Sequence, residues 1–304
     1  MRLNMSAICL AALPLALAGA VAPATSPGPR LPLRYKGLVS PTSLSAAFVM
    51  PGETLAVAVP PDVGEVHFEA AAGSVTATAP HGWRWAAPTA PGMYRLRVVA
   101  ADLRDTVTLQ AFVMVPAAAV RHGYLNGYHI GRYPAAPLRG LPAYRPPRGF
   151  VEVTAENENV YLTPHLQLGQ FVTKQGGRFP KYVVLDERLL VKLEELLDRV
   201  HEAGYDVRRF RIMSGYRTPY YNHAIGNVAY SRHIYGAAAD ILVDDLNRDG
   251  RIDRQDAAAL AAVVEHRVED PAQRASLGGI GEYPRTAAHG PFVHVDVRGF
   301  RARW

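Results

Sequence analysis

The sequence predicts two folded units of different class, an all-β unit followed by an α+β unit. Between residues 35 and 116, short runs of alternating apolar and polar residues are separated by turns rich in Pro, Gly and Asp, which is typical of β-strands. Beyond residue 151, a leucine stripe at helical spacing is followed by separate strand-like runs, which is typical of an α+β arrangement. A chain of 304 residues has room for about one to three domains.

Residues 1–20 have the pattern of a secretory signal peptide. Arg2 precedes an apolar run, and a small-x-small cleavage sequence ends at Ala20. The run is shorter than the roughly 20 residues that a membrane helix needs. We therefore expect export across the inner membrane, removal of this segment and no stable membrane span. Residues 21–34 are rich in Pro, Ala and Gly, which predicts a linker.

Cysteine use and net charge restrict the classes of function. Cys9 is the only cysteine and lies within the signal, so the mature chain would have no thiol for a disulfide or for catalysis. Any metal site must then use histidine and carboxylate ligands. The net charge of +6 suits an anionic polymer or phospholipid surface. Export and the lack of a dense Lys/Arg run argue against a nucleic-acid partner.

The first unit, residues 35–116, is predicted to be a small β-sandwich, because its strands recur at short, regular intervals. Trp85–Val98 resembles the late strands of immunoglobulin-like domains, in which a Pro-Gly turn leads into a tyrosine-bearing strand. This resemblance implies an immunoglobulin-like sandwich. No catalytic cluster occurs in the unit, so we expect a spacer or a binding module. Residues 117–150 are expected to form a connecting segment that either lines a groove or packs over one of the units.

The second unit, residues 151–304, is predicted to contain two helices and several strands. Asp186 is placed to cap the first helix, and a second helix is expected over Asp256–His266. Strands are expected over Ala239–Val243 and Phe292–Val297. The apolar stripe of the first helix, which we assign to the core, consists of Leu189, Leu190, Leu193, Leu196, Leu197 and Val200.

His233, Asp240 and His294 are a candidate metal site, with a hydrogen-bonded structural His–Asp set as the alternative. Zinc without thiolates takes two or three imidazoles and a carboxylate, and a catalytic site keeps one position for water. Gly236 allows a sharp turn between His233 and the strand that Asp240 opens. Alternation along the last strand directs Val293 to the core and His294 to the opposite face. If the two strands are neighbours, Asp240 and His294 meet across the ladder.

Four motifs occur in order in the second unit: SGYRTPYYN, SRHIYGAAAD, GGIGEYP and FVHVDVRG. Together they resemble the zinc D-Ala-D-Ala carboxypeptidase and murein endopeptidase family over roughly residues 150–304. The resemblance implies a small α+β fold with an antiparallel sheet, one zinc ion and peptidoglycan stem peptides as substrate. It assigns His233, Asp240 and His294 as zinc ligands. It also implies that Arg217, of the first motif, contacts the substrate carboxylate or the developing oxyanion.

The residue that accepts a proton from the attacking water is open. Many relatives carry an acid three residues before the last ligand, or a histidine two residues before it, where this chain has Pro291 and Phe292. Asp296 is the favoured candidate, because it shares a strand face with the last ligand, although it could instead orient that ligand. His289 and Glu282 in the preceding segment are the other candidates. A chain that has lost catalysis is a further alternative.

Asp245–Asp256, with the sequence DLNRDGRIDRQD, fits a twelve-residue calcium loop. An aspartate at the last position resembles dockerin-type loops. A polar turn followed by a helix cap is the alternative. We predict that Ca²⁺ fixes the strand that carries Asp240. The predicted ligands are Asp245, Asn247, Asp249, the Arg251 carbonyl and Asp256.

The leading prediction is a periplasmic or cell-wall-associated zinc peptidase that hydrolyses peptide bonds of peptidoglycan. A non-catalytic wall-binding protein that keeps the peptidase fold is the alternative, and a calcium-stabilised adhesion or structural protein is a third possibility. The sequence does not distinguish carboxypeptidase from endopeptidase action, and it gives no oligomeric state.

Overall fold

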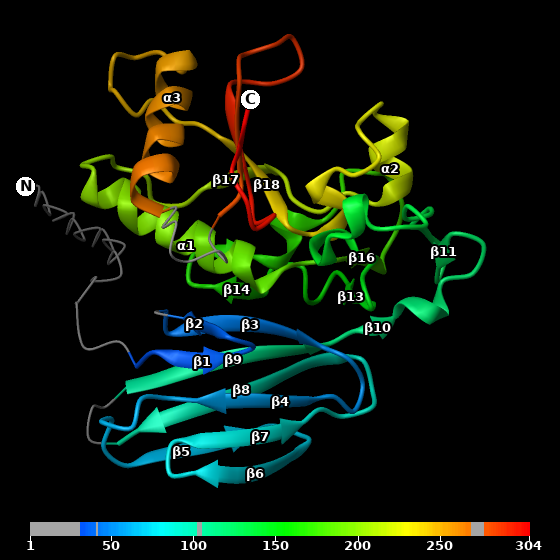
Figure 1. Ribbon diagram of the computed structural model, residues 1–304, viewed down its shortest axis with the longest axis vertical. Coiled ribbons are helices and arrows are strands. Elements are labelled where there is room, and N and C mark those ends of the chain that lie inside the picture. The colour runs from blue at the N-terminus through cyan, green and yellow to red at the C-terminus, as the bar shows by residue number, and fades with distance from the viewer. Residues whose placement is uncertain (1–30, 41, 102–104, 269–276) are drawn as a thin grey trace, which may run out of the picture.

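The computed structural model describes residues 31–40, 42–101, 105–268 and 277–304. The predicted signal peptide, residues 1–20, therefore lies outside the described residues. Figure 1 shows a β-unit of blue and cyan strands and, above it, a second unit of mixed helices and strands. Within the described part of the chain, no helix is long and apolar enough to cross a membrane.

The β-unit consists of two sheets that share one hydrophobic core. The first sheet has the order β2 (Leu38–Ser40), β1 (Leu33–Tyr35), β4 (Thr54–Ala58), β7 (Gly82–Ala86) and β6 (Ser74–Ala79). The second has the order β3 (Leu44–Val49), β9 (Asp105–Val113), β8 (Gly92–Ala100) and β5 (Val66–Ala70). Trp85 of the first sheet and Leu96 of the second are both buried in the shared core. A β-rich first unit is thus confirmed, whereas its immunoglobulin-like class stays a prediction.

The β-unit begins earlier than the sequence predicts. β1 starts at Leu33, inside the segment 21–34 that was expected to be a linker, and Leu31 and Leu33 are fully buried. Because Leu31 and Leu33 are two residues apart in an extended segment, both side chains point inward. The surrounding Pro and Gly residues hide this strand pattern in the sequence. At the other end, β10 (Val115–Pro116) pairs with β13 (Gly149–Val153) of the second unit, so the chain leaves the β-unit just before the predicted boundary.

The connecting segment, residues 117–150, packs against the second unit. It contains the hairpin of β11 (Tyr124–Leu125) and β12 (Tyr128–His129), followed by short turns of 3-10 helix. The segment has no separate core, as the sequence predicts. The following residues of this segment are buried in the core of the second unit: Leu125, Tyr128, Ile130 and Tyr144.

The helices of the second unit follow the predicted apolar stripes. α1 (Glu187–Glu202) begins after Asp186, whose side chain accepts a hydrogen bond from the backbone N–H of Arg188, and the predicted leucine stripe is buried. α3 (Arg254–Val263) continues as a π-helical turn over Val264–Val268. It starts two residues before the predicted helix, because Asp253 rather than Asp256 is its N-cap.

A five-stranded sheet is the centre of the second unit. Its order is β17 (Arg211–Ser214), β18 (Ala238–Leu242), β20 (Phe292–Asp296), β19 (Gly279–Tyr283) and β21 (Ala302–Arg303). All pairs are antiparallel except β19 with β21. The smaller elements are β16 (Lys181–Val183), which pairs with β13, the hairpin of β14 (Tyr161–Thr163) and β15 (Leu166–Gln167), and α2 (Pro219–Ala224). The predicted α+β unit is confirmed.

β3 and β9 bury both of their faces between the two units. Ala47 belongs to the core of the β-unit, whereas Phe48 and Phe112, which point the other way, belong to the core of the second unit. Glu187 at the start of α1 reinforces this contact. Its carboxylate accepts a hydrogen bond from the Phe48 backbone N–H at 2.9 Å and forms a salt bridge with Lys36 at 2.5 Å. The β-unit is therefore fixed against the unit that carries the candidate site.

Candidate metal centre

His233 is positioned by a tight turn just before the central strand of the sheet. It lies in a 3-10 helix, Arg232–Tyr235, that ends at Gly236 in the left-handed region with φ of +64°. A Cβ atom on Gly236 would lie 2.0 Å from the carbonyl oxygen of Val184, so only glycine fits. The turn that the sequence predicted at this glycine is confirmed, and it directs His233 toward the sheet.

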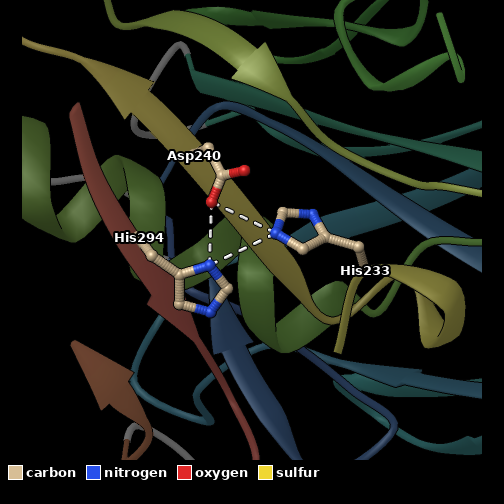
Figure 2. A group of neighbouring side chains, drawn as sticks. All are labelled: His233, Asp240 and His294. Carbon is tan, nitrogen blue, oxygen red and sulfur yellow. Dashed lines mark hydrogen bonds and ion pairs between the residues drawn. The ribbon is translucent and has the colours of Figure 1, made fainter. Parts of the chain in front are cut away.

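Asp240 and His294 are direct cross-strand partners of β18 and β20. Figure 2 shows that both side chains point toward His233. Oδ1 of Asp240 lies 2.8 Å from Nδ1 of His294 and 3.1 Å from Nε2 of His233, and the two nitrogens are 3.2 Å apart. All three residues are buried. The predicted meeting of Asp240 and His294 across the ladder is thus observed, with His233 completing a triangle of potential ligand atoms.

In each imidazole, the outer nitrogen, which is the one that points away from Asp240, has a partner that requires it to carry the proton. Nδ1 of His233 lies 2.6 Å from the carbonyl oxygen of Gly215, which can only accept a hydrogen bond. Nε2 of His294 lies 3.2 Å from a carboxylate oxygen of Asp296. In the neutral rings, the inner nitrogens therefore present lone pairs toward Oδ1 of Asp240. Three lone pairs that converge in a buried place need a cation between them.

The electrostatics of the group favour a neutral His233 and an ionised Asp240, whereas the two carboxylates beside His294 favour its protonated form until a metal ion replaces the proton. Burial lowers the pKa of His233, which favours its neutral, metal-binding form. Burial would raise the pKa of Asp240, but the adjacent His233 and His294 rings hold it well below its usual range. Burial would also lower the pKa of His294, but hydrogen bonds to Asp240 and Asp296 raise it. Two imidazole nitrogens and one carboxylate oxygen are a zinc-type ligand set.

The size of the triangle is also compatible with zinc. With metal–ligand distances of about 2.0–2.1 Å and tetrahedral angles, neighbouring ligand atoms are roughly 3.3 Å apart. The three separations of 2.8, 3.1 and 3.2 Å are slightly shorter. Small side-chain shifts would therefore admit the ion. Among the described residues, this is the one group of three or more His, Cys, Asp or Glu side chains close enough to hold a metal.

The metal-binding group lies in a cleft of about 470 Å³. Its walls are mostly aromatic and apolar, with three arginines among them. The cleft is lined by Leu138, Tyr144, Arg217, Asn227, Val228, Tyr230, Ser231, Arg232, His233, Asp240, Tyr283, Phe292, His294, Arg298 and Trp304. The three potential metal ligands therefore lie in the wall of a cleft.

Comparison with known proteins agrees with this geometry. Residues 170–296 match the family model described as Peptidase M15. This part of the chain is a Peptidase M15 domain. The match contains all three residues of the metal-binding group and ends at Asp296. It confirms the family that the sequence motifs indicated, the D-Ala-D-Ala carboxypeptidase family. A search of curated proteins found no match to the chain.

Arg217 of the M15 domain contacts the carboxylate oxygen of Asp240 that the two histidines do not contact. Its Nη2 donates to Oδ2 of Asp240 at 2.5 Å, and its Nε donates to the Ser214 hydroxyl at 2.8 Å. The backbone N–H of Arg217 also donates to the carbonyl of His233. The arginine thus leaves Oδ1 of Asp240 free to face the two histidines. Because Arg217 also lines the cleft, its position fits both a structural salt bridge and the substrate contact that the resemblance implies.

Asp296 lies on the side of His294 that faces away from the three ligand atoms. It is fully buried, and its oxygens accept hydrogen bonds from Gly279 N–H at 2.9 Å and from the Arg298 side chain. Its contact with Nε2 of His294 fixes the orientation of that ring. The structure therefore does not support Asp296 as the group that takes a proton from water. Strand alternation placed it on the correct face but could not distinguish the near side of the ring from the far side.

The other two candidates for that role lie outside the cleft lining. His289 packs edge-on against Phe292, and its Nδ1 is 2.8 Å from the carbonyl of Gly290. Glu282 is exposed on β19, where it lines a separate pocket that shares Tyr283 and Trp304 with the metal cleft. Glu282 thus adjoins the lining residue Tyr283 in the sequence, and His289 contacts the lining residue Phe292.

The predicted calcium loop folds as a turn with a helix cap. Asp245 accepts hydrogen bonds from the backbone N–H groups of Asp249 and Gly250. Asp256 is fully buried and accepts from Leu246 and Asp253, and these bonds satisfy the start of α3. The acidic side chains of the loop do not form a second metal-binding group among the described residues. The calcium ligands, including Asn247 and Arg251, stay a prediction.

Most residues of the cleft wall were not singled out from the sequence, and four of them contact the metal-binding group or each other closely. Arg232 lies inside the SRHIYGAAAD motif, so its position next to a proposed ligand was a usable signal. Tyr144 belongs to the Tyr-rich connecting segment, for which groove lining was one of two expectations. Arg298 is two residues from Asp296 and holds its carboxylate. Trp304 packs against His294 with ring centroids 5.2 Å apart, and no local sequence pattern predicts this contact.

Proposed function

We propose that the protein is a zinc metallopeptidase that hydrolyses peptide bonds in peptidoglycan stem peptides or cross-links. The observation that carries the proposal is the convergence of three lone-pair atoms, from His233, Asp240 and His294, in a cleft of an M15 domain. The M15 match supports peptidase chemistry, and the resemblance of the four motifs supports a peptidoglycan substrate.

The residues of the chain have separate tasks in this proposal. His233, Asp240 and His294 hold the ion, while Gly215 and Asp296 fix the two rings in the metal-binding tautomer. A bound zinc ion would lower the pKa of a water molecule to roughly 7 and polarise the scissile carbonyl.

Arg217 has two tasks. It keeps Asp240 in place and presents its guanidinium to the cleft, where charge develops on the carbonyl oxygen of the substrate.

The proton acceptor is proposed to come from the loop before β20 or from the adjacent strand. His289 and Glu282 remain the candidates, because each neighbours the cleft wall and Asp296 points away from it. Movement of the His289 side chain into the cleft would bring it near the attacking water, whereas Glu282 is the cross-strand partner of Val293 and starts on the face of β19 opposite to the ligands. Hydrogen bonds of this kind are often completed only when substrate binds.

We further propose that the protein is exported and acts in the periplasm or at the cell wall. The N-terminal signal pattern and the basic net charge of +6 support this location. The β-unit, with an immunoglobulin-like class as its proposed fold, would serve as a spacer or wall-binding module. Ca²⁺ at Asp245–Asp256 is proposed as a structural ion.

A non-catalytic wall-binding protein is the second candidate function. One specific observation favours it. Among the described residues that line the cleft, Asp240 is the only carboxylate, and its two oxygens are occupied by the two histidines and Arg217. A chain with this cleft could bind wall peptides without cutting them.

One experiment separates the two candidates. Purified mature protein, loaded with zinc and assayed for metal content, is incubated with intact sacculi with and without a zinc chelator. Release of shortened or uncross-linked muropeptides, identified by mass and prevented by the chelator, is the expected result. Binding to sacculi without any product from fully zinc-loaded protein would instead establish the non-catalytic function.

A further inference from the structure

Arg232 is a buried cation whose pKa is lowered by burial, and the charge of Asp296, which is itself paired with Arg298, opposes this shift only in part. The residue is 3% exposed and lies between the rings of Tyr144 and Tyr235, with its guanidinium carbon 4.6 and 5.2 Å from the two centroids. Its Nη1 donates to the carbonyl oxygen of Ala143 at 2.5 Å, whereas its Nε has no hydrogen-bond partner. Among the described residues, no carboxylate forms a salt bridge with it.

The other two arginines of the cleft differ from Arg232 in this respect. Arg217 is paired with Asp240, and Arg298 is paired with Asp296. A buried charge without a counter-ion is costly, because the interior replaces its hydration poorly. Aromatic faces and one backbone carbonyl compensate only part of that loss. An arginine in this place is therefore suited to receive an anion from outside the chain.

The charge of the cleft as a whole favours an anionic ligand. Three arginines line it against a single carboxylate, that of Asp240, whose two oxygens are already occupied. A metal ion on the three ligands would add further positive charge. A peptide that brings a negative group into this cleft would bind better than a neutral peptide of the same shape.

We infer that Arg232 is a binding residue for a free carboxylate of the substrate, close to the scissile bond. The guanidinium matches a carboxylate in shape and charge, and Arg232 directly precedes His233, so the carboxylate would share the cleft with the metal ligands. This inference rests on the proposed peptidase function and narrows its substrate. The carboxylate belongs either to a C-terminal D-amino acid or to the diamino acid at a cross-link.

The wild-type protein provides the first test. Hydrolysis is compared for a D-Ala-D-Ala-terminated peptide with a free C-terminal carboxylate and for its C-terminal amide. A second pair consists of cross-linked dimers whose diamino-acid carboxylate, next to the cross-link, is free or amidated. We expect a KM at least about tenfold lower for the free form of one pair, as for hydrogen bonds to charged groups. The pair that shows the difference identifies the source, and equal KM values in both pairs would overturn the inference.

Variants assign the effect to Arg232. In Arg232→Gln, we expect the preference for the free carboxylate, measured as the ratio of kcat/KM for the free and the amidated peptide, to fall by about ten- to a hundredfold. Arg232→Lys should retain part of the preference. Arg211→Gln is the matched control, because Arg211 of β17 forms an exposed salt bridge with Asp244 and does not line the cleft. A loss of equal size on both substrates would give Arg232 a structural role and overturn the inference.

A binding measurement keeps the inference separate from the proposed function. Calorimetry of zinc-loaded protein with the free and amidated D-alanyl peptides requires no turnover. If neither peptide is cleaved but the free form binds at least about tenfold more tightly, and Arg232→Gln removes the difference, the peptidase proposal fails while the carboxylate site stands. Equal affinity of the wild type within this pair and within the matching pair of cross-linked dimers would reject the carboxylate site.

Discussion

Nδ1 of His294 lies 2.8 Å from Oδ1 of Asp240, and the two residues are direct partners across the ladder of β18 and β20. The register of two strands therefore fixes this contact. Displacement of either strand by one residue would turn its ligand to the opposite face of the sheet. The Asp240–His294 pair of the candidate metal centre is thus set by the middle of the sheet, whereas His233 is positioned separately by the buried 3-10 helix that ends at Gly236.

Removal of a proposed ligand should abolish metal binding. His233→Ala leaves two ligands, so we expect loss of stoichiometric zinc and a fall in muropeptide release of at least about a thousandfold, on the scale of other lost metal-dependent steps. Zinc content is measured by elemental analysis alongside activity. His67→Ala is the control, because His67 is exposed on β5 in the other unit. Full zinc content in the His233 variant would contradict the assignment.

Asp296→Asn tests whether Asp296 positions His294. The amide cannot hold the imidazole and Arg298 as the carboxylate does, so zinc affinity should fall by about ten- to a hundredfold. Added zinc should then restore most of the turnover. A proton acceptor would behave differently, because its loss lowers kcat even with zinc saturated. A saturating zinc titration of the variant, followed by kcat and KM measurement, decides between the two roles.

Gly236→Ala should unfold or strongly destabilise the second unit. The new Cβ would meet the Val184 carbonyl oxygen at 2.0 Å in a left-handed conformation, so we expect a loss of more than about 3 kcal/mol. Gly226→Ala is the matched control. Gly226 also has a positive φ, of +71°, but nothing lies within 4 Å of the added atom, so about 1 kcal/mol is expected. Similar midpoints of denaturant unfolding for both variants would disprove the steric argument.

Glu187→Ala tests the contact between the two units. It leaves the Phe48 N–H and Lys36 without their acceptor, which should destabilise the protein by about 1–3 kcal/mol. Glu69→Ala removes an exposed salt bridge with Arg97 and should cost less than about 1 kcal/mol. Thermal unfolding of the two variants is compared. A midpoint for Glu187→Ala that equals that of the control would mean that the interface tolerates the loss.

The calcium prediction has a direct test. Addition of Ca²⁺ should raise the melting temperature, and EGTA at a concentration that spares zinc should lower it. Asp249→Asn should weaken the response, since Asp249 is a predicted ligand that lies exposed in the loop. Asp62→Asn, an exposed change in the β-unit, serves as the comparison. An unchanged melting temperature with either reagent would leave only the turn and helix cap that the structure shows.

The parts of the fold that depend on local periodicity were predictable. The stripe of α1, its Asp186 cap and the facing of Val293 and His294 follow from spacing alone. The ligand set needed more, because the pairing of β18 with β20 joins segments that are 54 residues apart at Asp240 and His294. The complete ligand set followed from the resemblance of the motifs to a known family, because periodicity alone does not show which strands pair.

Other features depend on tertiary contacts that no local pattern encodes. Leu31 and Leu33 lie in a segment whose composition predicts a linker, because two inward side chains are too few to give a recognisable alternation of apolar and polar residues. Asp296 was placed on the correct strand face, but its contacts with Gly279 and Arg298 come from the packing of β19 and the chain end. Trp304 reaches the cleft only because β21 adds to the edge of the sheet.

The shared face of β3 and β9 determines how this chain can be divided. Phe48 and Phe112 fill the core of the M15-containing unit, so cutting away the β-unit would uncover an apolar patch on the half that keeps every proposed ligand. Such a fragment would aggregate before it lost any group needed for chemistry. Recombination that transferred residues 170–296 alone would carry the metal centre without the surface that shields it. The β-unit therefore shields an apolar face of the unit that carries the candidate site.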